Sequence, residues 1–210
     1  MAGALWDFLT EHFGGLPQPW WAVLAIYETL LVGAWLVERA LVRRFRRLSG
    51  DPTGSARKDR RYVRWWVLQL VLLQLPLLRA GRWRTPLPLA WPTVWTGVAL
   101  ALSGVAIRLW SLSVLRENFS YVVHVDKGHR LVTAGPYRLV RHPLYSGLIV
   151  FFLGVPLVIC DLWILLVLAG YIGVSVTLRI RREERALRER FGAAYEAWRA
   201  KTRLLVPFIF

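Results

Sequence analysis

Residues 133–145 form a polar, turn-rich stretch that stands directly before a long apolar run. Because the residue before a proline is pushed out of the α region, Arg141 and His142 should be extended, and Pro143 suits the first turn of a helix. A helix start has unsatisfied N–H groups and a partial positive charge, so it can hold a carboxylate or a phosphate. Arg138 and Arg141 would add positive charge to such an anion site.

Arg179 and Glu183 are a second candidate pair, because they lie four residues apart in the sequence. If the helix of the preceding apolar run continues past Leu178, their side chains share one face at the membrane surface. A guanidinium there could neutralise a bound anion, and a carboxylate could remove a proton from a bound substrate. Taken alone, the two residues are better explained as a surface ion pair that ends the helix and contributes little stability.

The composition is that of a membrane protein. Of the 210 residues, 56% are hydrophobic, and the apolar residues come in blocks. The 12 Trp and 7 Tyr residues are types that favour membrane interfaces. The net charge of +15 fits a nucleic-acid-binding face or positive-inside loops, and the second interpretation is better because the arginines lie between apolar blocks. A single cysteine, Cys160, excludes an intrachain disulfide and a cysteine-based metal site.

The apolar blocks predict an all-α integral membrane protein with about five transmembrane helices. The first three spans should lie near residues 20–42, 65–78 and 92–115. The run 144–178 is too long for one helix, since a ~30 Å core needs only about 20 residues at ~1.5 Å rise per residue. Cys160-Asp161 should break this run into a hairpin whose two ends face the same side.

The charges around these spans predict the topology. The basic linker 43–64 should be cytoplasmic, which places the N-terminus outside and the C-terminus in the cytoplasm. We expect one membrane domain over 1–210, with three spans in 1–115 and the functional core in 116–210. In the tail 179–210, apolar residues at three- and four-residue steps predict an amphipathic helix along the membrane surface, with a kink at Gly192.

Glu28, Glu38 and Arg108 are among the charged residues within the first and third spans. Glu28 and Glu38 are costly at membrane depth, and we interpret both as protonated or hydrogen-bonded structural residues. Arg108 lies toward the cytoplasmic end of its span and could either extend to the membrane surface or reach into a site. Small residues in the same span, among them Ala101 and Ser103-Gly104, predict close helix contacts.

The polar motifs occur in an order that resembles the isoprenylcysteine carboxyl methyltransferase family, which is related to the membrane phospholipid N-methyltransferases. The resemblance covers about the last hundred residues. It rests on Glu117-Asn118-Phe119-Ser120, His129-x-Leu131-Val132-Thr133, Gly135-Pro136-Tyr137, Arg141-His142-Pro143-x-Tyr145, Glu183-Glu184 and Phe191-Gly192-x-x-Tyr195.

The resemblance implies a methyl donor, S-adenosyl-L-methionine, and no metal. It makes Arg179 and Glu183 the catalytic candidates. It assigns donor binding to residues of the same motifs: Val132, Gly135, Pro136, Tyr137, Arg141, His142, Pro143, Tyr145, Glu184 and Tyr195. The loop, the helix ends and the amphipathic C-terminal helix would form an active site that faces the cytoplasm.

The acceptor stays open at this point. A carboxylate, as in an isoprenylcysteine-like compound, needs no general base, whereas a phospholipid amine or a thiol must lose a proton. We expect a lipophilic or lipidated substrate that enters laterally from the membrane lipids, and no nucleic-acid partner. A different class of function is also compatible with the charge: a non-catalytic membrane protein that binds anionic lipid or a partner through its basic loops.

Overall fold

The fold is seen in a computed structural model, which describes residues 3–4, 7, 20–48, 91–115 and 131–205. The elements of this part of the chain are, in order, α2 (Trp20–Leu48), α4 (Trp91–Leu115), the 3-10 helix η3 (Gly135–Arg138), α5 (Pro143–Val158), α6 (Leu162–Phe191) and α7 (Ala193–Arg199). The described residues contain no strand beyond a parallel bridge between Val140 and Arg203. The all-α prediction is therefore confirmed for them.

In the part of the chain that the structure describes, three helices are long and apolar enough to cross a membrane, namely α2, α4 and α6. The helix α5 has 16 residues and is a shorter apolar helix. The predicted span at 65–78 lies outside the described residues, as do the loop 116–130 and most of the linker 43–64. The count of five spans therefore stays a prediction. The first helix also runs further than predicted, to Leu48, because leucine and arginine are good helix formers.

The helices α4 and α5 pack against each other through backbone rather than through large side chains. A methyl group added at Gly104 of α4 would lie 2.5 Å from the Phe151 nitrogen of α5. One added at Gly154 would lie 2.5 Å from the Ala101 nitrogen. Small residues allow this approach, as they do in membrane helix pairs. Ser103, which was also expected at such a contact, is instead exposed.

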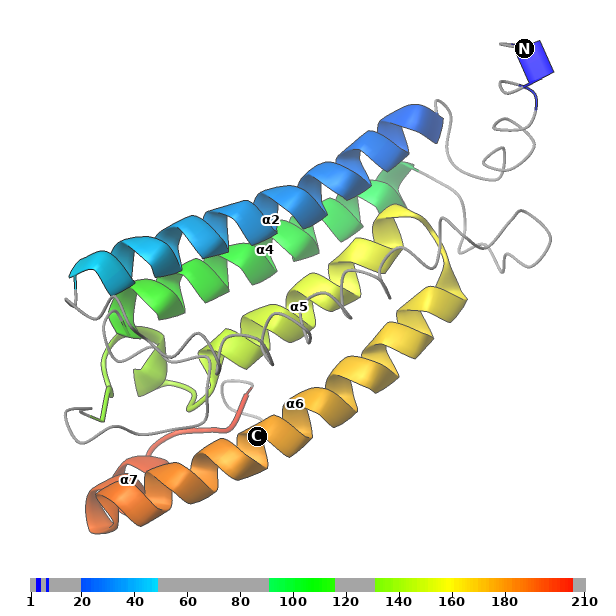
Figure 1. Ribbon diagram of the computed structural model, residues 1–210. Coiled ribbons are helices and arrows are strands. Elements are labelled where there is room, and N and C mark those ends of the chain that lie inside the picture. Colours follow the sequence, from blue (N-terminus) through cyan, green and yellow to red (C-terminus); the bar gives the residue numbers. More distant parts are fainter. Residues whose placement is uncertain (1–2, 5–6, 8–19, 49–90, 116–130, 206–210) are drawn as a thin grey trace.

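The hairpin turn forms where the sequence predicts it. The helix α5 ends at Val158, Cys160 adopts a φ of +52°, and Asp161 caps the next helix by accepting a hydrogen bond of 3.1 Å from the Ile164 amide. From this turn α6 runs back along α5 toward the other end of the molecule, where η3 and α7 lie (Figure 1). The buried core between the long helices includes Tyr27 and Phe152.

The helix after the turn differs from the prediction in its length. A helix along the surface was expected to begin at residue 179, but α6 continues unbroken from Leu162 to Phe191. Its sequence has no proline, and Gly192 with φ +49° is the first residue that ends it. The short helix α7 follows at once. At ~1.5 Å per residue, 30 residues exceed a ~30 Å core, so the charged end from Arg179 onward extends beyond the apolar part.

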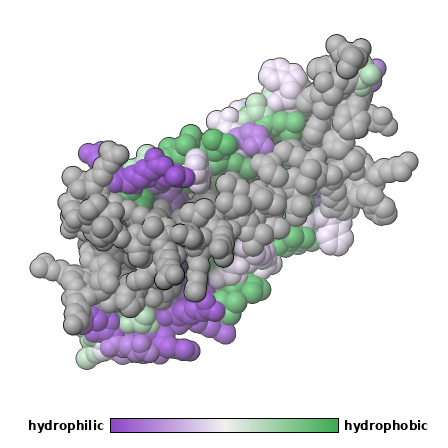
Figure 2. Space-filling model, viewed as in Figure 1, coloured by the Kyte–Doolittle hydropathy of each residue, from purple (hydrophilic) through white to green (hydrophobic). Residues whose placement is uncertain are grey.

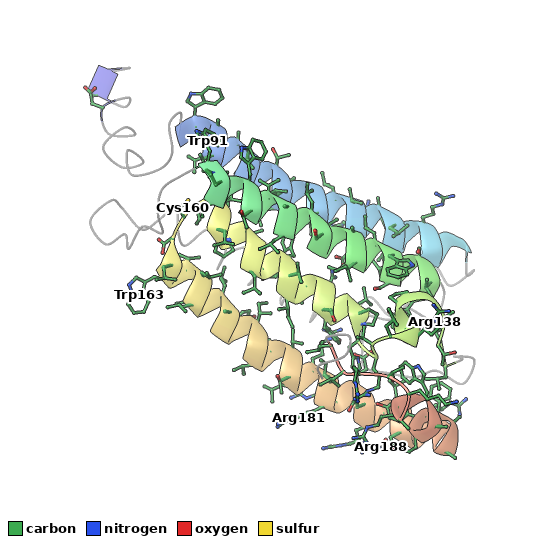
Figure 3. The ribbon with its side chains drawn as sticks, turned by 180° about the vertical axis from the view of Figure 1, so that it is seen from behind. Trp91, Arg138, Cys160, Trp163, Arg181 and Arg188 are labelled. Carbon is green, nitrogen blue, oxygen red and sulfur yellow. The ribbon has the colours of Figure 1, made fainter. Side chains whose placement is uncertain are left out.

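Polar and apolar residues separate along the length of the bundle. Hydrophilic residues gather where α2 ends and where α6 passes into α7 (Figure 2). From behind, Arg138 and Arg188 lie at this end, and Trp91, Cys160 and Trp163 lie at the opposite end (Figure 3). Half of the Trp163 surface is exposed, as suits a membrane interface. The end with η3 and α7 therefore carries the polar groups that could do chemistry.

Candidate active site

The loop before α5 is fixed by packing against α7. Gly135 takes a φ of +59°, which glycine adopts without strain, and opens η3. Tyr137 in η3 is buried in a small apolar cluster with Tyr195 and Trp198 of α7. The Trp198 indole Nε1 donates a hydrogen bond of 3.0 Å to the Tyr137 carbonyl. The motifs around Tyr137 and Tyr195, far apart in sequence, are therefore in one cluster.

The segment after α7 returns to hold the backbone of Arg141 and His142. The Arg141 amide donates to the Arg203 carbonyl at 2.7 Å, and the His142 amide donates to the Leu204 carbonyl at 3.1 Å. In the other direction, the Arg203 amide donates to the Leu139 carbonyl at 3.1 Å. This short parallel pairing gives the two residues before Pro143 the non-helical backbone that the sequence predicts, with His142 at φ −127° and ψ 57°.

The start of α5 is partly capped by its own chain. The amides of Tyr145 and Ser146 both donate to the His142 carbonyl, at 3.0 and 3.1 Å. The imidazole of His142 is buried, with its Nε2 3.5 Å from one Glu184 oxygen and its Nδ1 4.0 Å from one Glu183 oxygen. His142 therefore stands between α5 and the glutamates of α6.

Arg141 connects α6 to the C-terminal segment. Its Nε donates to Glu184 Oε1 at 2.9 Å, and its Nη1 donates to the carbonyls of Thr202 at 2.6 Å and Arg199 at 3.2 Å. Burial alone would raise the pKa of the Glu184 carboxyl, but the neighbouring His142 and Arg141 outweigh burial and lower the pKa to about 2. The Glu184 carboxyl is therefore ionised at neutral pH, where it holds the Arg141 guanidinium.

The two catalytic candidates meet on the hydroxyl of Tyr145. The Tyr145 hydroxyl donates to Glu183 Oε2 at 2.8 Å and accepts from Arg179 Nε at 2.6 Å. The Arg179 guanidinium also lies 5.8 Å from the centre of the Tyr145 ring. The first turn of α5 thus supplies the group on which Arg179 and Glu183 of α6 converge. Sequence spacing placed the two on one helix face but did not reveal this tyrosine between them.

Three buried polar atoms near these groups have no hydrogen-bond partner in the described part of the chain: the hydroxyls of Tyr137 and Tyr195 and the Nε2 of His142. Burial, followed by the charge of Glu183, raises the pKa of Tyr137. Burial and the charge of Glu184 likewise raise the pKa of Tyr195. Both phenols therefore stay protonated and can donate to an acceptor atom. Buried polar atoms are normally paired, so these are positions where a ligand could bind.

Not every predicted residue reaches this cluster. Val132 is half-buried and packs in the apolar cluster of Tyr137. At Gly135 an added methyl would lie 2.8 Å from a Val114 methyl carbon, so this residue faces α4. Pro136 is buried within η3, and Pro143 begins α5. These four shape the loop and the helix start, and donor contacts for them stay a prediction.

A polar cavity of about 420 Å³ lies beside the cluster, on the side of α7. It is lined by Arg141, Glu196, Arg199, Ala200, Thr202, Arg203 and Leu204. Sequence reasoning did not assign the C-terminal residues among these to a site, because they belong to none of the recognised motifs.

A second polar contact that sequence reasoning missed joins Glu38 to Arg108. The Arg108 Nη2 lies 2.6 Å from Glu38 Oε1 and 2.7 Å from Oε2, and its Nε lies 2.9 Å from Oε2. The signal was available, since opposite charges in two apolar helices are expected to pair. The prediction that Glu38 is structural does not account for the position of this pair next to α5.

Comparisons with known proteins show what the chain is similar to. The phospholipid methyltransferase family matches residues 92–194, which run from α4 into α7. A probable protein-S-isoprenylcysteine O-methyltransferase of Oryza sativa subsp. indica is 31% identical over 121 residues, which cover 57% of this chain and 63% of that protein. Over this region the chain is therefore similar to protein-S-isoprenylcysteine O-methyltransferases.

Two further relatives differ in coverage. The uncharacterized protein YpbQ of Bacillus subtilis is 27% identical over 164 residues, which cover 76% of this chain and 96% of that protein. The solved structure of the eukaryotic intramembrane Ras methyltransferase, isoprenylcysteine carboxyl methyltransferase, has the same fold, with a TM-score of 0.53 and 23% identity. That match covers 74% of this chain and 53% of the solved one. The chain therefore spans less than two thirds of the rice protein and about half of the solved structure.

Proposed function

We propose that this protein is an S-adenosyl-L-methionine-dependent methyltransferase that acts on a lipophilic acceptor in the membrane. Carboxyl O-methylation of an isoprenylcysteine-like compound is the reaction that its relatives' names support. The observation that carries the proposal is the convergence of Arg179 and Glu183 on the Tyr145 hydroxyl, next to buried tyrosine hydroxyls for which the described residues provide no partner. This cluster stands where α6 leaves its apolar part, so it is reachable from both water and lipid.

The residues present fit the methyl donor. Its carboxylate could accept from the buried hydroxyls of Tyr137 and Tyr195, which remain protonated. Its cationic groups suit the carboxylates of Glu183 and Glu184 and the ring of Tyr145, since a sulfonium is attracted to anions and to aromatic faces. When bound, the donor supplies an activated methyl group. His142, between the two glutamates, would lie beside the bound donor.

The protein's own groups have the task of placing the acceptor. A carboxylate is already a nucleophile at neutral pH, so it needs positioning, neutralisation and exclusion of water rather than a base. Arg179 brings positive charge to the cluster, and the Tyr145 hydroxyl fixes its guanidinium. Glu183 accepts a hydrogen bond from the Tyr145 hydroxyl and thereby orients it. With an amine or thiol acceptor, Glu183 would instead receive the proton that the acceptor loses.

We also infer that this end of the bundle faces the cytoplasm. Arg43 and Arg44 lie at the end of α2, and Arg181, Arg182 and Arg185 lie on α6 beside the site. Cytoplasmic flanks carry an excess of such residues. Labelling of a cysteine introduced at Arg185 in sealed inverted and right-side-out vesicles tests the orientation, since only cytoplasmic exposure gives labelling in inverted vesicles.

Donor binding is tested by calorimetric titration of the detergent-purified protein with S-adenosylhomocysteine. We expect saturable binding, with a larger Kd for His142→Ala. The control Arg188→Lys alters an exposed ion pair with Glu196 and should leave the Kd unchanged. A folded protein that binds nothing would contradict the proposal and favour a basic-loop binder of anionic lipid.

The acceptor is tested with labelled S-adenosyl-L-methionine. The probes are N-acetyl-S-farnesylcysteine, phosphatidylethanolamine and a long-chain thiol, each in detergent micelles. A carboxyl methyl ester releases its label as methanol in mild base, whereas an N-methyl or S-methyl product does not. Base-labile product from the farnesylcysteine supports a carboxyl acceptor. Base-stable product from one of the other probes would instead identify an amine or a thiol as the acceptor.

A further inference from the structure

A chain of polar contacts reaches the site from α2, outside the residues 92–194 that the family comparison covers. Glu38 of α2 and Arg108 of α4 form a bidentate ion pair, with side chains only 9% and 12% exposed. Burying two charges is costly, and pairing them seldom stabilises a protein more than apolar packing would. The position of this pair therefore calls for a reason other than helix packing.

Arg108 makes a third contact that its pairing with Glu38 does not require. Its Nη1 donates to the Leu144 carbonyl at 2.9 Å, in the first turn of α5. Gly147 leaves the space for this, since a methyl there would lie 2.7 Å from the Arg108 Cγ. The Arg108 side chain thus crosses α5 at a position that has no side chain, and it contacts the residue directly before Tyr145.

The contact is close to the proposed chemistry. Tyr145 carries the hydroxyl that joins Arg179 and Glu183, so a shift of the first turn of α5 moves that hydroxyl. The charge of Arg108 also acts on Tyr137, where it opposes the rise in that phenol's pKa. Arg108 is therefore within electrostatic reach of one unpartnered donor and in contact with the turn that bears Tyr145.

We propose that Glu38 and Arg108 are positioning residues of the methyltransferase site. Glu38 fixes the Arg108 guanidinium, and Arg108 fixes the first turn of α5 so that the Tyr145 hydroxyl lies between Arg179 and Glu183. This inference rests on the proposed function. It also gives the N-terminal helix α2, outside the family match, a part in catalysis.

The decisive variant is Arg108→Lys. Lysine keeps the charge opposite Glu38, but a single ammonium cannot replace the planar fork that reaches both carboxylate oxygens and the Leu144 carbonyl. We expect kcat per S-adenosylhomocysteine-binding site to fall roughly tenfold, because a misplaced group slows an oriented reaction, while KM for the acceptor changes little. Arg188→Lys is the matched control and should leave both constants unchanged. Expressing kcat per donor-binding site corrects for any loss of folded protein.

A double-mutant cycle tests the route through Tyr145. If Arg108 acts by placing that hydroxyl, Arg108→Lys should cause no further loss of kcat in a Tyr145→Phe background. Losses that multiply would show that Arg108 acts elsewhere and would overturn the proposal. If Arg108→Lys does not fold, Glu38→Asp is the second variant, since it keeps the charge and shortens the reach to Arg108.

A readout without turnover separates this inference from the proposed function. 3-Fluorotyrosine incorporated at position 145 gives a ¹⁹F resonance that reports the ring environment whether or not methyl transfer occurs. We expect this resonance to shift in Arg108→Lys or Glu38→Asp and not in Arg188→Lys. If the ¹⁹F resonance shifts in these variants but the protein transfers no methyl group, the positioning of Tyr145 by Arg108 is supported and the proposed function is contradicted. An unmoved resonance would overturn the positioning itself.

Discussion

The two ends of the bundle are closed in different ways. At the hairpin end, Asp161 accepts from the Ile164 amide three residues away, and Cys160 completes a local turn. At the other end, Arg141 contacts residues 43 to 61 positions away. The hairpin end is held by contacts between residues close in sequence, whereas the site end is held by contacts that form only when distant segments pack together. Changes at the hairpin end should therefore affect stability, and changes at the site end should affect chemistry.

The largest effect should come from the convergence on Tyr145. Glu183→Gln or Arg179→Ala should lower kcat by about 10²–10³-fold, the usual cost of removing one preorganised electrostatic group. The thermal midpoint should remain close to that of the unchanged protein, since Glu183 is partly exposed. Methyl transfer to the farnesylcysteine probe measures the first quantity and thermal unfolding the second. Unchanged turnover in both variants would remove them from the site.

Changes in the packing of α4 on α5 should lower stability rather than kcat. Gly104→Ala places a methyl 2.5 Å from the backbone nitrogen of Phe151, which cannot rotate away, so we expect roughly 1–3 kcal/mol of destabilisation from overpacking. Gly173→Ala on α6 is the control, since a methyl there has nothing within 4 Å. Thermal unfolding in detergent distinguishes the two. Equal midpoints would mean that α4 and α5 are less closely packed in solution.

The cap at the hairpin turn should have a smaller effect. Asp161→Ala removes the acceptor for the Ile164 amide and should cost about 0.5–2 kcal/mol, the range for lost helix caps. Asp161→Asn keeps an acceptor oxygen and should recover most of this stability. Neither should change kcat per donor-binding site. A loss of kcat in Asp161→Ala would contradict the expectation that the hairpin end affects stability and not chemistry.

A further effect concerns Glu184 and depends on pH. An ordinary glutamate titrates near 4.5, and the pKa of Glu184 is about 2. Because the folded pKa is the lower one, its contribution to stability is present above pH 4.5 and is lost as the pH falls toward 2. The difference in thermal midpoint between the unchanged protein and Glu184→Gln should therefore narrow over this acid range. A constant difference would mean that Glu184 acts through shape rather than charge.

Local sequence signals predicted the local features well. Hydrophobicity placed α4 within one residue, and the pair Cys160-Asp161 marked the hairpin turn. The spacing of Arg179 and Glu183 placed them on one face, because α6 has no proline and continues as one helix to Phe191. Where the prediction differed, as with a surface helix beginning at residue 179, the sequence of α6 offered no boundary there.

The contacts between distant segments could not be predicted in the same way. Nothing in the sequence of Thr202 or Leu204 indicates that this tail pairs with the loop before α5, because backbone hydrogen bonds carry no side-chain signature. The close packing at Gly104 and Gly154 depends on which faces of two helices meet. Small residues are common in apolar helices, so their presence alone does not identify that face.

The sequence by itself determined the membrane character, the helices and the order of the motifs, because these depend on composition and on spacing along one chain. The tertiary structure decided that Tyr145 lies between Arg179 and Glu183, and that Glu38 reaches α5 through Arg108. The physical reason is that hydrogen bonds act over about 3 Å, whereas these partners are separated by 34 to 70 residues. Only the packing of the helices brings such atoms together.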